Sequence, residues 1–323
     1  MAQLRYAHAI NQALADAMAA DDSVVLLGED IAEAGGSFKV TRGLIDRFGA
    51  ARVIDTPISE ATMASAAVGA AMSGLRPVLE IMFMDFVTLA MDALVNQAAK
   101  ARFMFGGRTS VPMVARMPHG GGLSAGPQHS QCLEAWFAHV PGLKVVCPWS
   151  PQDAYSLMRS AIEDPDPVIF VEHKGLYAGR GEVDTGLRVP LGQARVARSG
   201  TDLTLVSYGA TVGTCLAVAE QLAAEGVEVE VIDLRTLQPW DEKTVFSSVA
   251  RTHRVVVVHE AVQAFGVGAE IAARIAEDAF DELDAPVVRV GAPFMPVPFS
   301  SALEKQYGVD ADRIVAGVRR VLA

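Results

Sequence analysis

Cysteine is scarce in this chain, and the few cysteines follow no recognisable pattern. The three are Cys132, Cys147 and Cys215, an odd number without any Cys-x-x-Cys spacing. Neither a disulfide framework nor a cysteine-ligated zinc site is therefore expected. Unpaired cysteines favour a reducing compartment, and we expect a cytoplasmic protein.

Positive charge and long hydrophobic runs are also in short supply. The chain has 27 Lys and Arg against 38 Asp and Glu, a net charge of −11. A nucleic-acid-binding protein needs a basic face, so that class is not expected. The N-terminal segment carries polar residues along its whole length, unlike a signal peptide, and the longest apolar run, 61–75, is too short and weakly hydrophobic for a bilayer. We expect no membrane span.

Aromatic residues make up only 7% of the chain, although 51% of it is hydrophobic. Its apolar residues are mainly Ala, Val, Leu and Met, which suit closely packed helices and strands buried on both faces. The length of 323 residues favours two domains. Another subunit is expected to cover part of the surplus apolar surface.

The first half alternates short apolar runs with helical patterns. Strands are expected in SVVLLGED, RVIDTPIS, RPVLEIMF, VPMVARMP, LKVVCP and DPVIFVEHK. Helices are expected near the N-terminus, where Ile10, Leu14 and Met18 share a face, and over 61–74, 86–104, about 131–139 and SPQDAYSLMRSAIED. In the last of these, Ser150 has the sequence of an N-cap.

The second half repeats the alternation after a segment rich in Gly, Pro and charge, 175–199, which is interpreted as an interdomain crossing. Val-rich strands separated by helices predict a parallel sheet covered on both faces. The expected fold is therefore α/β, with two open and mostly parallel domains. The predicted boundaries are 1–180 and 201–323, with a linker over 181–200.

In sheets of this kind, ligands bind beyond the carboxyl ends of the strands. Four places follow predicted strands: 28–30, Ser59–Glu60, 84–86 and the stretch after Met117. Catalytic or binding residues are expected there.

Glu60 is a lone acid in front of an uncharged helical run, 61–74. It is open to two interpretations. An acid in the first turn is stabilised by the helix dipole, by about 0.3–1 kcal/mol, and Ser59 could cap the helix. Alternatively, its place after a strand makes it a candidate reagent.

The glycine-rich segment 117–132 contains two histidines, which can donate or accept a proton near neutral pH. His119 is expected to be a solvated residue of a surface loop. His129, between Pro127–Gln128 and an expected helix start, is the stronger functional candidate.

No motif of the common nucleotide or hydrolase sites occurs. The segment FGVGAE, 265–270, has two glycines but Ile271 where a dinucleotide fingerprint needs its third, so it is predicted to be a loop. There is no P-loop, HExxH or GxSxG sequence.

Several segments together resemble one family along the whole chain: LLGED, DTPISE, RPVLEIMFMDF, DALVNQAAK, GPQHSQ, PGLKVVCPWSPQDA, DPVIFVEHK and DLRTLQPWD. They are similar to the beta subunits of thiamine-diphosphate-dependent 2-oxo acid dehydrogenases, which act on pyruvate, branched-chain 2-oxo acids or acetoin. The resemblance implies a pyrimidine-binding domain followed by a transketolase-type C-terminal domain.

The resemblance also implies roles for single residues. Glu60 would hydrogen-bond the aminopyrimidine ring of the cofactor and favour its imino tautomer, Phe86 would stack on that ring, and Ile58 and Met82 would shape the pocket. His129 would handle protons at the substrate carbonyl and during acyl transfer to lipoamide.

Further implied sites involve acids and main-chain oxygens. Glu29 joins the cofactor site, and with Asp92 it would lie near a solvent channel between two active sites. A structural potassium site would use Met113, Ala161, Ile162, Asp164 and Asp166.

The chain lacks the glycine–aspartate–glycine motif and downstream asparagine that hold magnesium and the cofactor diphosphate. In the family these lie on a separate alpha subunit. The resemblance therefore implies half of an enzyme, in an α2β2 heterotetramer that delivers acyl groups to a lipoyl acyltransferase core.

Other functions are kept as alternatives. One is a transketolase-like half from another pathway, and another is a non-catalytic subunit that only recruits the acyltransferase core. For the substrate, the single Gln128 before His129 favours the pyruvate or acetoin type over the branched-chain type.

Overall fold

The computed structural model describes all residues, 1–323, and the chain divides into two compact units. Unit 1 comprises Met1–His119 and Trp136–Leu191. Unit 2 comprises Gly120–Ala135 and Gly192–Ala323, so it includes the glycine-rich segment from Gly120 onward. No helix is long and apolar enough to cross a membrane.

Unit 1 is built on a parallel sheet with the strand order β6-β7-β5-β4-β2-β3. A separate antiparallel pair joins β1 to β8. The strands are β1 (Ala2–Arg5), β2 (Val24–Gly28), β3 (Val53–Asp55), β4 (Arg76–Glu80), β5 (Val114–His119), β6 (Lys144–Val146), β7 (Val168–His173) and β8 (Arg180–Val183). The helices are α1 (Tyr6–Ala20), α2 (Leu44–Phe48), α3 (Glu60–Met72), α4 (Ala99–Met104), α6 (Pro151–Glu163) and the short η3 (Lys174–Leu176), with α5 (Glu134–Ala138) at the unit boundary.

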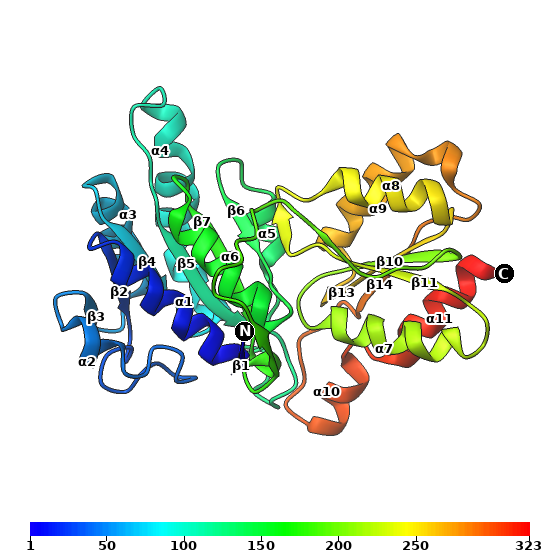
Figure 1. Cartoon of the computed structure of the whole chain (residues 1–323), viewed down its shortest axis with the longest axis horizontal. Coiled ribbons are helices and arrows are strands. Elements are labelled where there is room, and N and C mark those ends of the chain that lie inside the picture. Colours follow the sequence, from blue (N-terminus) through cyan, green and yellow to red (C-terminus); the bar gives the residue numbers. More distant parts are fainter. The chain divides into compact units, whose positions relative to one another are not determined.

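Alternation along the strands explains how helices cover both faces of this sheet. One set of alternate residues, including Val24, Leu26 and Val78, shares a buried cluster with helices α1 and α6, which pack side by side (Figure 1). Because neighbouring strand residues point to opposite faces, the other set faces the second layer. Helix α3 packs there against β2 and β4.

The expected helix over 86–104 is present, but its winding is irregular. It runs as a 3-10 helix η1 (Met84–Ala90), a π-helix η2 (Asp92–Ala98) and then α4. Helix α3 packs against both irregular turns. π-turns within helices are frequently found at functional sites, so this face of unit 1 is a candidate for one.

Unit 2 contains the second sheet, ordered β14-β13-β10-β11-β9. Only β9 runs antiparallel to its neighbour. Helices α7 and α11 cover one face, while α8 and α9 lie on the other (Figure 1). The strands are β9 (Arg195–Arg198), β10 (Leu203–Ser207), β11 (Val229–Asp233), β12 (Thr236–Gln238), β13 (Val255–Val262) and β14 (Val288–Ala292). The helices are α7 (Thr211–Ala223), α8 (Glu242–Thr252), α9 (Val267–Asp278), η4 (Phe280–Glu282), α10 (Ser301–Tyr307) and α11 (Ala311–Leu322).

The predicted α/β class with two mostly parallel sheets is confirmed. The Ser150 cap is also confirmed, because its Oγ accepts the Asp153 N–H at 3.1 Å. The expected helix over 131–139 is shorter than predicted, and 175–199 is not wholly irregular, since β8 lies in it and pairs with β1. The domain limits and linker remain predictions.

A buried charge cluster joins three neighbouring strands at their carboxyl ends. Arg116 of β5 is 1% exposed and donates two hydrogen bonds to Glu172 of β7, at 2.6 and 2.7 Å, and a third to Glu80 of β4. Tyr177 also donates to Glu172, at 2.8 Å. Burial raises the pKa of Glu80 despite the opposing effect of Arg116. Two carboxylates therefore share one guanidinium in a space without solvent.

Replacing Arg116 with Met tests how far this cluster supports unit 1. The variant leaves Glu80 and Glu172 buried without their cation, which costs about 3–5 kcal/mol for a buried pair of this kind. Urea unfolding of the Arg116→Met chain should show that loss. The exposed Arg108→Met serves as the matched control and should stay within about 0.5 kcal/mol of the parent. A loss below 1 kcal/mol for Arg116→Met would contradict the assignment.

Candidate functional site

Glu60 lies at the first position of α3 and is only 5% exposed. Ser59 occupies the N-cap position, but its side chain caps no backbone N–H and donates instead to the Thr62 hydroxyl at 2.8 Å. The expected Ser59 cap bond is therefore absent. The carboxylate of Glu60 is held in a dry position at the positive end of the helix dipole.

Glu29 is the second acid at this edge of the sheet. It follows β2 directly, is 7% exposed, and its Oε1 is buried without a hydrogen-bond partner. Burial raises its pKa, and the negative charges of Glu60 and Asp30 raise it further. The structure thus brings Glu29 and Glu60 together. Asp92 is exposed in the π-helix and accepts a hydrogen bond from Asn96 at 2.7 Å.

Phe86 is half-buried in η1, just after β4, and is the end of a row of aromatic rings. Its ring centroid lies 5.8 Å from that of Phe83, which lies 5.7 Å from Phe38, which in turn lies 5.1 Å from Tyr177. The Nζ atom of Lys174 lies 5.3 Å from the Phe83 ring centroid. Because Tyr177 bonds Glu172, this row connects Phe86 to the buried charge cluster.

The two predicted apolar pocket residues differ in exposure. Met82 is half-buried, whereas Ile58 is 81% exposed. Ile58 thus offers an apolar side chain two positions before Glu60. Burial of such a side chain under a ligand or a further subunit would be favourable, because it would remove apolar surface from water.

His119 is not a solvated loop residue, so that expectation is wrong. It ends β5, is 3% exposed, and its ring packs edge-on against that of His173 with centroids 5.3 Å apart. The two histidines are register partners at the carboxyl ends of β5 and β7. The pair was missed because neither sequence position shows which strands are neighbours. The signal that could have revealed it is that each histidine directly ends an apolar strand run.

His129 belongs to unit 2 and lies half-exposed in the loop between Gly120 and Ala135. Its backbone N–H bonds the Gly126 carbonyl oxygen at 3.4 Å. Ser130, next in sequence, is 2% exposed and its hydroxyl has no hydrogen-bond partner within the chain. Ser130 is a polar group that sequence reasoning missed.

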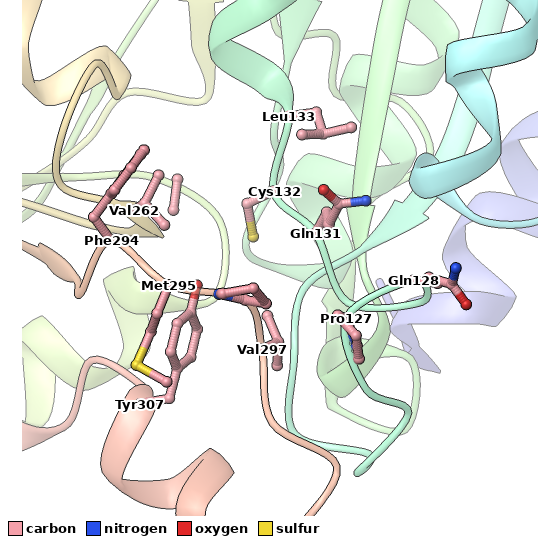
Figure 2. Close-up of a pocket in the computed structure, with 12 residues that line it drawn as sticks. Pro127, Gln128, Gln131, Cys132, Leu133, Val262, Phe294, Met295, Val297 and Tyr307 are labelled. Carbon is pink, nitrogen blue, oxygen red and sulfur yellow. The ribbon is translucent and has the colours of Figure 1, made fainter.

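A cavity of about 580 Å³ adjoins this loop within unit 2. Figure 2 shows Pro127, Gln131 and Cys132 on one side of it and Met295 and Tyr307 on the other. Its size falls in the range of small-molecule sites, about 300–1,000 Å³. The remaining wall is mostly apolar, formed by Gln128, Leu133, Ala261, Val262, Phe294, Pro296 and Val297.

His259 explains the glycines of the FGVGAE segment. This histidine is fully buried, and a Cβ atom at Gly266 or Gly268 would come within 2.7–2.8 Å of its ring. Its Nδ1 lies 3.1 Å from the Ala261 carbonyl oxygen, and its ring stacks on Tyr208. The two glycines therefore allow the start of α9 to pack closely on His259. The predicted loop is wrong for most of the segment, because Val267–Glu270 belong to α9.

Comparison with known proteins identifies both units. The family model of the transketolase pyrimidine-binding domain matches residues 2–180, and that of the transketolase C-terminal domain matches 192–314. The beta-2 subunit of the mitochondrial pyruvate dehydrogenase E1 component from Oryza sativa subsp. japonica is 44% identical, over 97% of this chain and 84% of its own. The beta subunit of acetoin:2,6-dichlorophenolindophenol oxidoreductase from Bacillus subtilis (strain 168) is 46% identical, over 95% of this chain and 94% of its own.

The chain belongs to the family of 2-oxo acid dehydrogenase beta subunits of the pyruvate and acetoin type. A solved split-gene transketolase, an inactive beta4 tetramer, has the same fold with a TM-score of 0.83. It is 23% identical and covers 99% of this chain, with 98% of its own length matched. The family prediction made from the sequence motifs is confirmed.

A beta subunit with a pyrimidine-binding domain implies binding of thiamine diphosphate. The residues of unit 1 fit the pyrimidine half of this cofactor: a buried carboxylate at Glu60, an aromatic ring at Phe86 and apolar side chains at Ile58 and Met82. The individual roles of these four residues, and those of Glu29 and His129, stay predictions.

The proposed potassium ligands fit a metal ion poorly. The carbonyl oxygens of Ile162 and Asp164 accept hydrogen bonds from Arg76, at 2.7 and 3.3 Å, and the Met113 carbonyl accepts the Val168 N–H. The Asp164 carboxylate binds Lys144 through both oxygens, at 2.6 and 2.7 Å, while Asp166 pairs with Arg102. Ala161 is buried in α6. Cationic side chains of the chain itself thus already contact most of the oxygen atoms that would ligate the ion.

Exchanging potassium for another monovalent cation tests this disagreement. Since Arg76 and Lys144 supply the positive charge, the melting temperature of the chain should be the same, within about 1 °C, in matched potassium and tetramethylammonium buffers. Thermal unfolding followed by circular dichroism measures it. A specific potassium stabilisation that saturates with concentration would restore the five residues as a metal site.

His259 predicts a pH dependence of stability. Its burial lowers the pKa of the imidazole, with Arg289 acting in the same direction and Glu134 opposing it. In the unfolded chain this histidine binds a proton near pH 6.5, whereas in the folded chain it binds the proton only at lower pH. The free energy of unfolding is therefore highest above pH 6.5 and decreases below it. Between pH 7 and 5.5 we expect His259 to lower the free energy of unfolding, by at most about 1 kcal/mol.

The His259→Gln variant isolates this contribution. It should show a flatter dependence over the same pH range, whatever its absolute stability. The matched control is His8→Gln at an exposed position of α1, which should keep the slope of the parent. Equal slopes for the parent and His259→Gln in urea unfolding would show that the imidazole titrates normally.

Proposed function

We propose that the chain is the beta subunit of a thiamine-diphosphate-dependent pyruvate or acetoin dehydrogenase component. It works with an alpha subunit in an α2β2 heterotetramer and passes the acyl group to lipoamide on a partner acyltransferase. The observation that carries the proposal is the buried Glu60 carboxylate beside Glu29, in a domain of the pyrimidine-binding family.

The bound cofactor supplies a nucleophilic carbon once its thiazolium ring has lost a proton. Glu60 contributes a hydrogen bond to the aminopyrimidine ring, and its dry position strengthens that bond because few water molecules compete for it. Glu29 lies at the same edge, and its raised pKa means that it binds a proton more readily than an ordinary glutamate. Phe86 orients the ring by stacking, and His129 moves protons during the later steps.

The dependence on an alpha subunit rests on what the chain does not contain and on its surface. It has no glycine–aspartate–glycine motif for magnesium and diphosphate. Large apolar side chains are exposed at the end of α4, where Phe103 is 90%, Met104 72% and Phe105 52% exposed. A contiguous apolar segment of this kind marks an interaction surface. Magnesium would then be held mainly by the alpha subunit.

The relatives named for pyruvate and for acetoin are similarly identical to this chain, at 44% and 46%, so both substrates stay in the proposal. We retain the cytoplasm as the proposed location, because Cys132, Cys147 and Cys215 form no disulfide bond, which suits a reducing compartment.

The test is the Glu60→Gln variant in the complex co-expressed with its alpha subunit. The parent complex is assayed on pyruvate, acetoin and branched-chain 2-oxo acids with an artificial electron acceptor, and activity on pyruvate or acetoin is expected. Glutamine keeps the shape of Glu60 but loses its charge, so kcat should fall about 100-fold or more, the scale of a lost transition-state hydrogen bond.

The exposed Glu33→Gln is the matched control and should keep kcat within twofold of the parent. Unchanged turnover in Glu60→Gln would remove Glu60 from the chemistry. Preference for branched-chain substrates would correct the substrate class, and a beta subunit that is fully active alone would refute the half-enzyme proposal.

A further inference from the structure

The loop that carries His129 has an unusual backbone. Four of its residues lie in the left-handed region: Gly120 (φ 88°), Gly122 (φ 91°), Ser124 (φ 53°) and Gly126 (φ 75°). Glycine enters this region freely and is therefore flexible in it, whereas serine reaches it only at an energetic cost. A segment of this composition needs outside contacts to keep one shape.

Glu304 of α10 supplies such contacts from a distant part of the sequence. Its side chain is largely buried, with the residue 8% exposed, and it accepts hydrogen bonds from the N–H groups of Gly122 and Ser124 at 2.8 and 2.9 Å. The Ser124 hydroxyl adds a third bond at 3.3 Å. Hydrogen bonds from backbone N–H groups to a carboxylate are about twice as strong as neutral ones.

Glu260 extends the same arrangement by one residue. Located in β13, it accepts the Gly121 N–H at 2.7 Å. Two carboxylates from separate elements of unit 2 therefore bind three loop N–H groups within four residues. One of the residues that Glu304 binds is Ser124, whose positive φ is energetically costly. The hydrogen bonds of Glu304 therefore stabilise the loop at the residue where its backbone is strained.

The segment around α10 contacts the loop at further points on the way to His129. The Phe299 ring packs so close to Gly126 that a Cβ atom there would lie 2.2 Å from it. Tyr307, in the last turn of α10, shares the 580 Å³ cavity with Pro127 and Gln128 (Figure 2). Burial raises the pKa of Tyr307 to about 12, so its hydroxyl stays protonated at neutral pH.

We propose that Glu304 is a positioning residue for His129, because it holds residues 120–126 in the one loop shape that presents the histidine. This inference rests on the proposed function, in which His129 acts during acyl transfer. Glu304 itself takes no part in the chemistry. It acts through the Gly122 and Ser124 N–H groups, while Phe299 and Tyr307 support the same loop from the side.

The activity test uses the co-expressed complex with Glu304→Ala and Glu304→Gln. Two reactions are compared: decarboxylation with an artificial electron acceptor, and acyl transfer to lipoamide. For Glu304→Ala we expect kcat of acyl transfer to fall at least tenfold and its pH profile to shift, while the Kd of thiamine diphosphate stays within twofold. Glu304→Gln keeps one acceptor oxygen and should fall between alanine and the parent.

Hydrogen exchange on the loop gives a readout that needs no activity. In the chain without cofactor, the Gly122 and Ser124 amides should be protected, and exchange should become at least tenfold faster in Glu304→Ala. Glu220→Gln, at an exposed position of α7, is the matched control and should change neither exchange nor kinetics.

Several results would overturn the proposal. Unchanged exchange in Glu304→Ala shows that the carboxylate does not hold the loop. If exchange becomes faster but acyl transfer stays within twofold of the parent, the loop shape does not position His129. If the affinity for thiamine diphosphate falls as much as acyl transfer does, the variant has a general defect. If the parent complex processes no 2-oxo acid or acetoin, the proposed function fails, and exchange alone then decides whether Glu304 holds the loop.

Discussion

The ion cluster of Arg116 with Glu80 and Glu172 is the contact on which the functional edge of unit 1 depends. It joins the carboxyl ends of three parallel strands, and the segments that leave those ends carry Phe86, His119 and Lys174. A guanidinium shared between two buried carboxylates tolerates little movement, because separating either pair leaves a charge without solvent. The row of aromatic rings from Tyr177 through Phe38 and Phe83 links this rigid cluster to Phe86.

The second organising feature is the contrast between dry and exposed groups. Glu60 and Glu29 are acids in places with almost no solvent, where a carboxylate interacts strongly with any partner it meets. Ile58 and the apolar end of α4 are exposed although they are hydrophobic. Both departures from the usual distribution agree with the proposed function, in which a cofactor and an alpha subunit cover these surfaces.

Much of the fold was predictable from local patterns. Apolar runs bounded by Gly, Pro and acids located most strands, and Ser150 with Pro151 and Asp153 marked the start of α6. The winding of 84–104 could not be predicted, because a 3-10 turn and a π-turn leave no periodic signal of their own. Strand β1 and its partner β8 were missed since each is short and stable only when paired with the other.

The site shows the same division between local and distant information. The place of Glu60 after a strand and before an uncharged helix made it a candidate, and the set of motifs indicated the family and the cofactor. The burial of His119 beside His173, the raised pKa of Glu29 and the packing of Gly266 and Gly268 on His259 depend on partners far away in the sequence. Around the predicted potassium ligands, Arg76 and Lys144 donate hydrogen bonds to oxygens of Ile162 and Asp164, and the local sequence does not show these contacts.

The sequence by itself determined the α/β class, the family and the residues at the strand ends, since these follow from periodicity and short motifs. Only the tertiary structure decided how those residues are held. Glu304 follows Gly122 by 182 residues, yet it binds that residue and thereby shapes the loop of His129. Nothing in the sequence shows which backbone N–H groups will donate hydrogen bonds to a given carboxylate. Their pairing exists only once the sheet of unit 2 and α10 have packed.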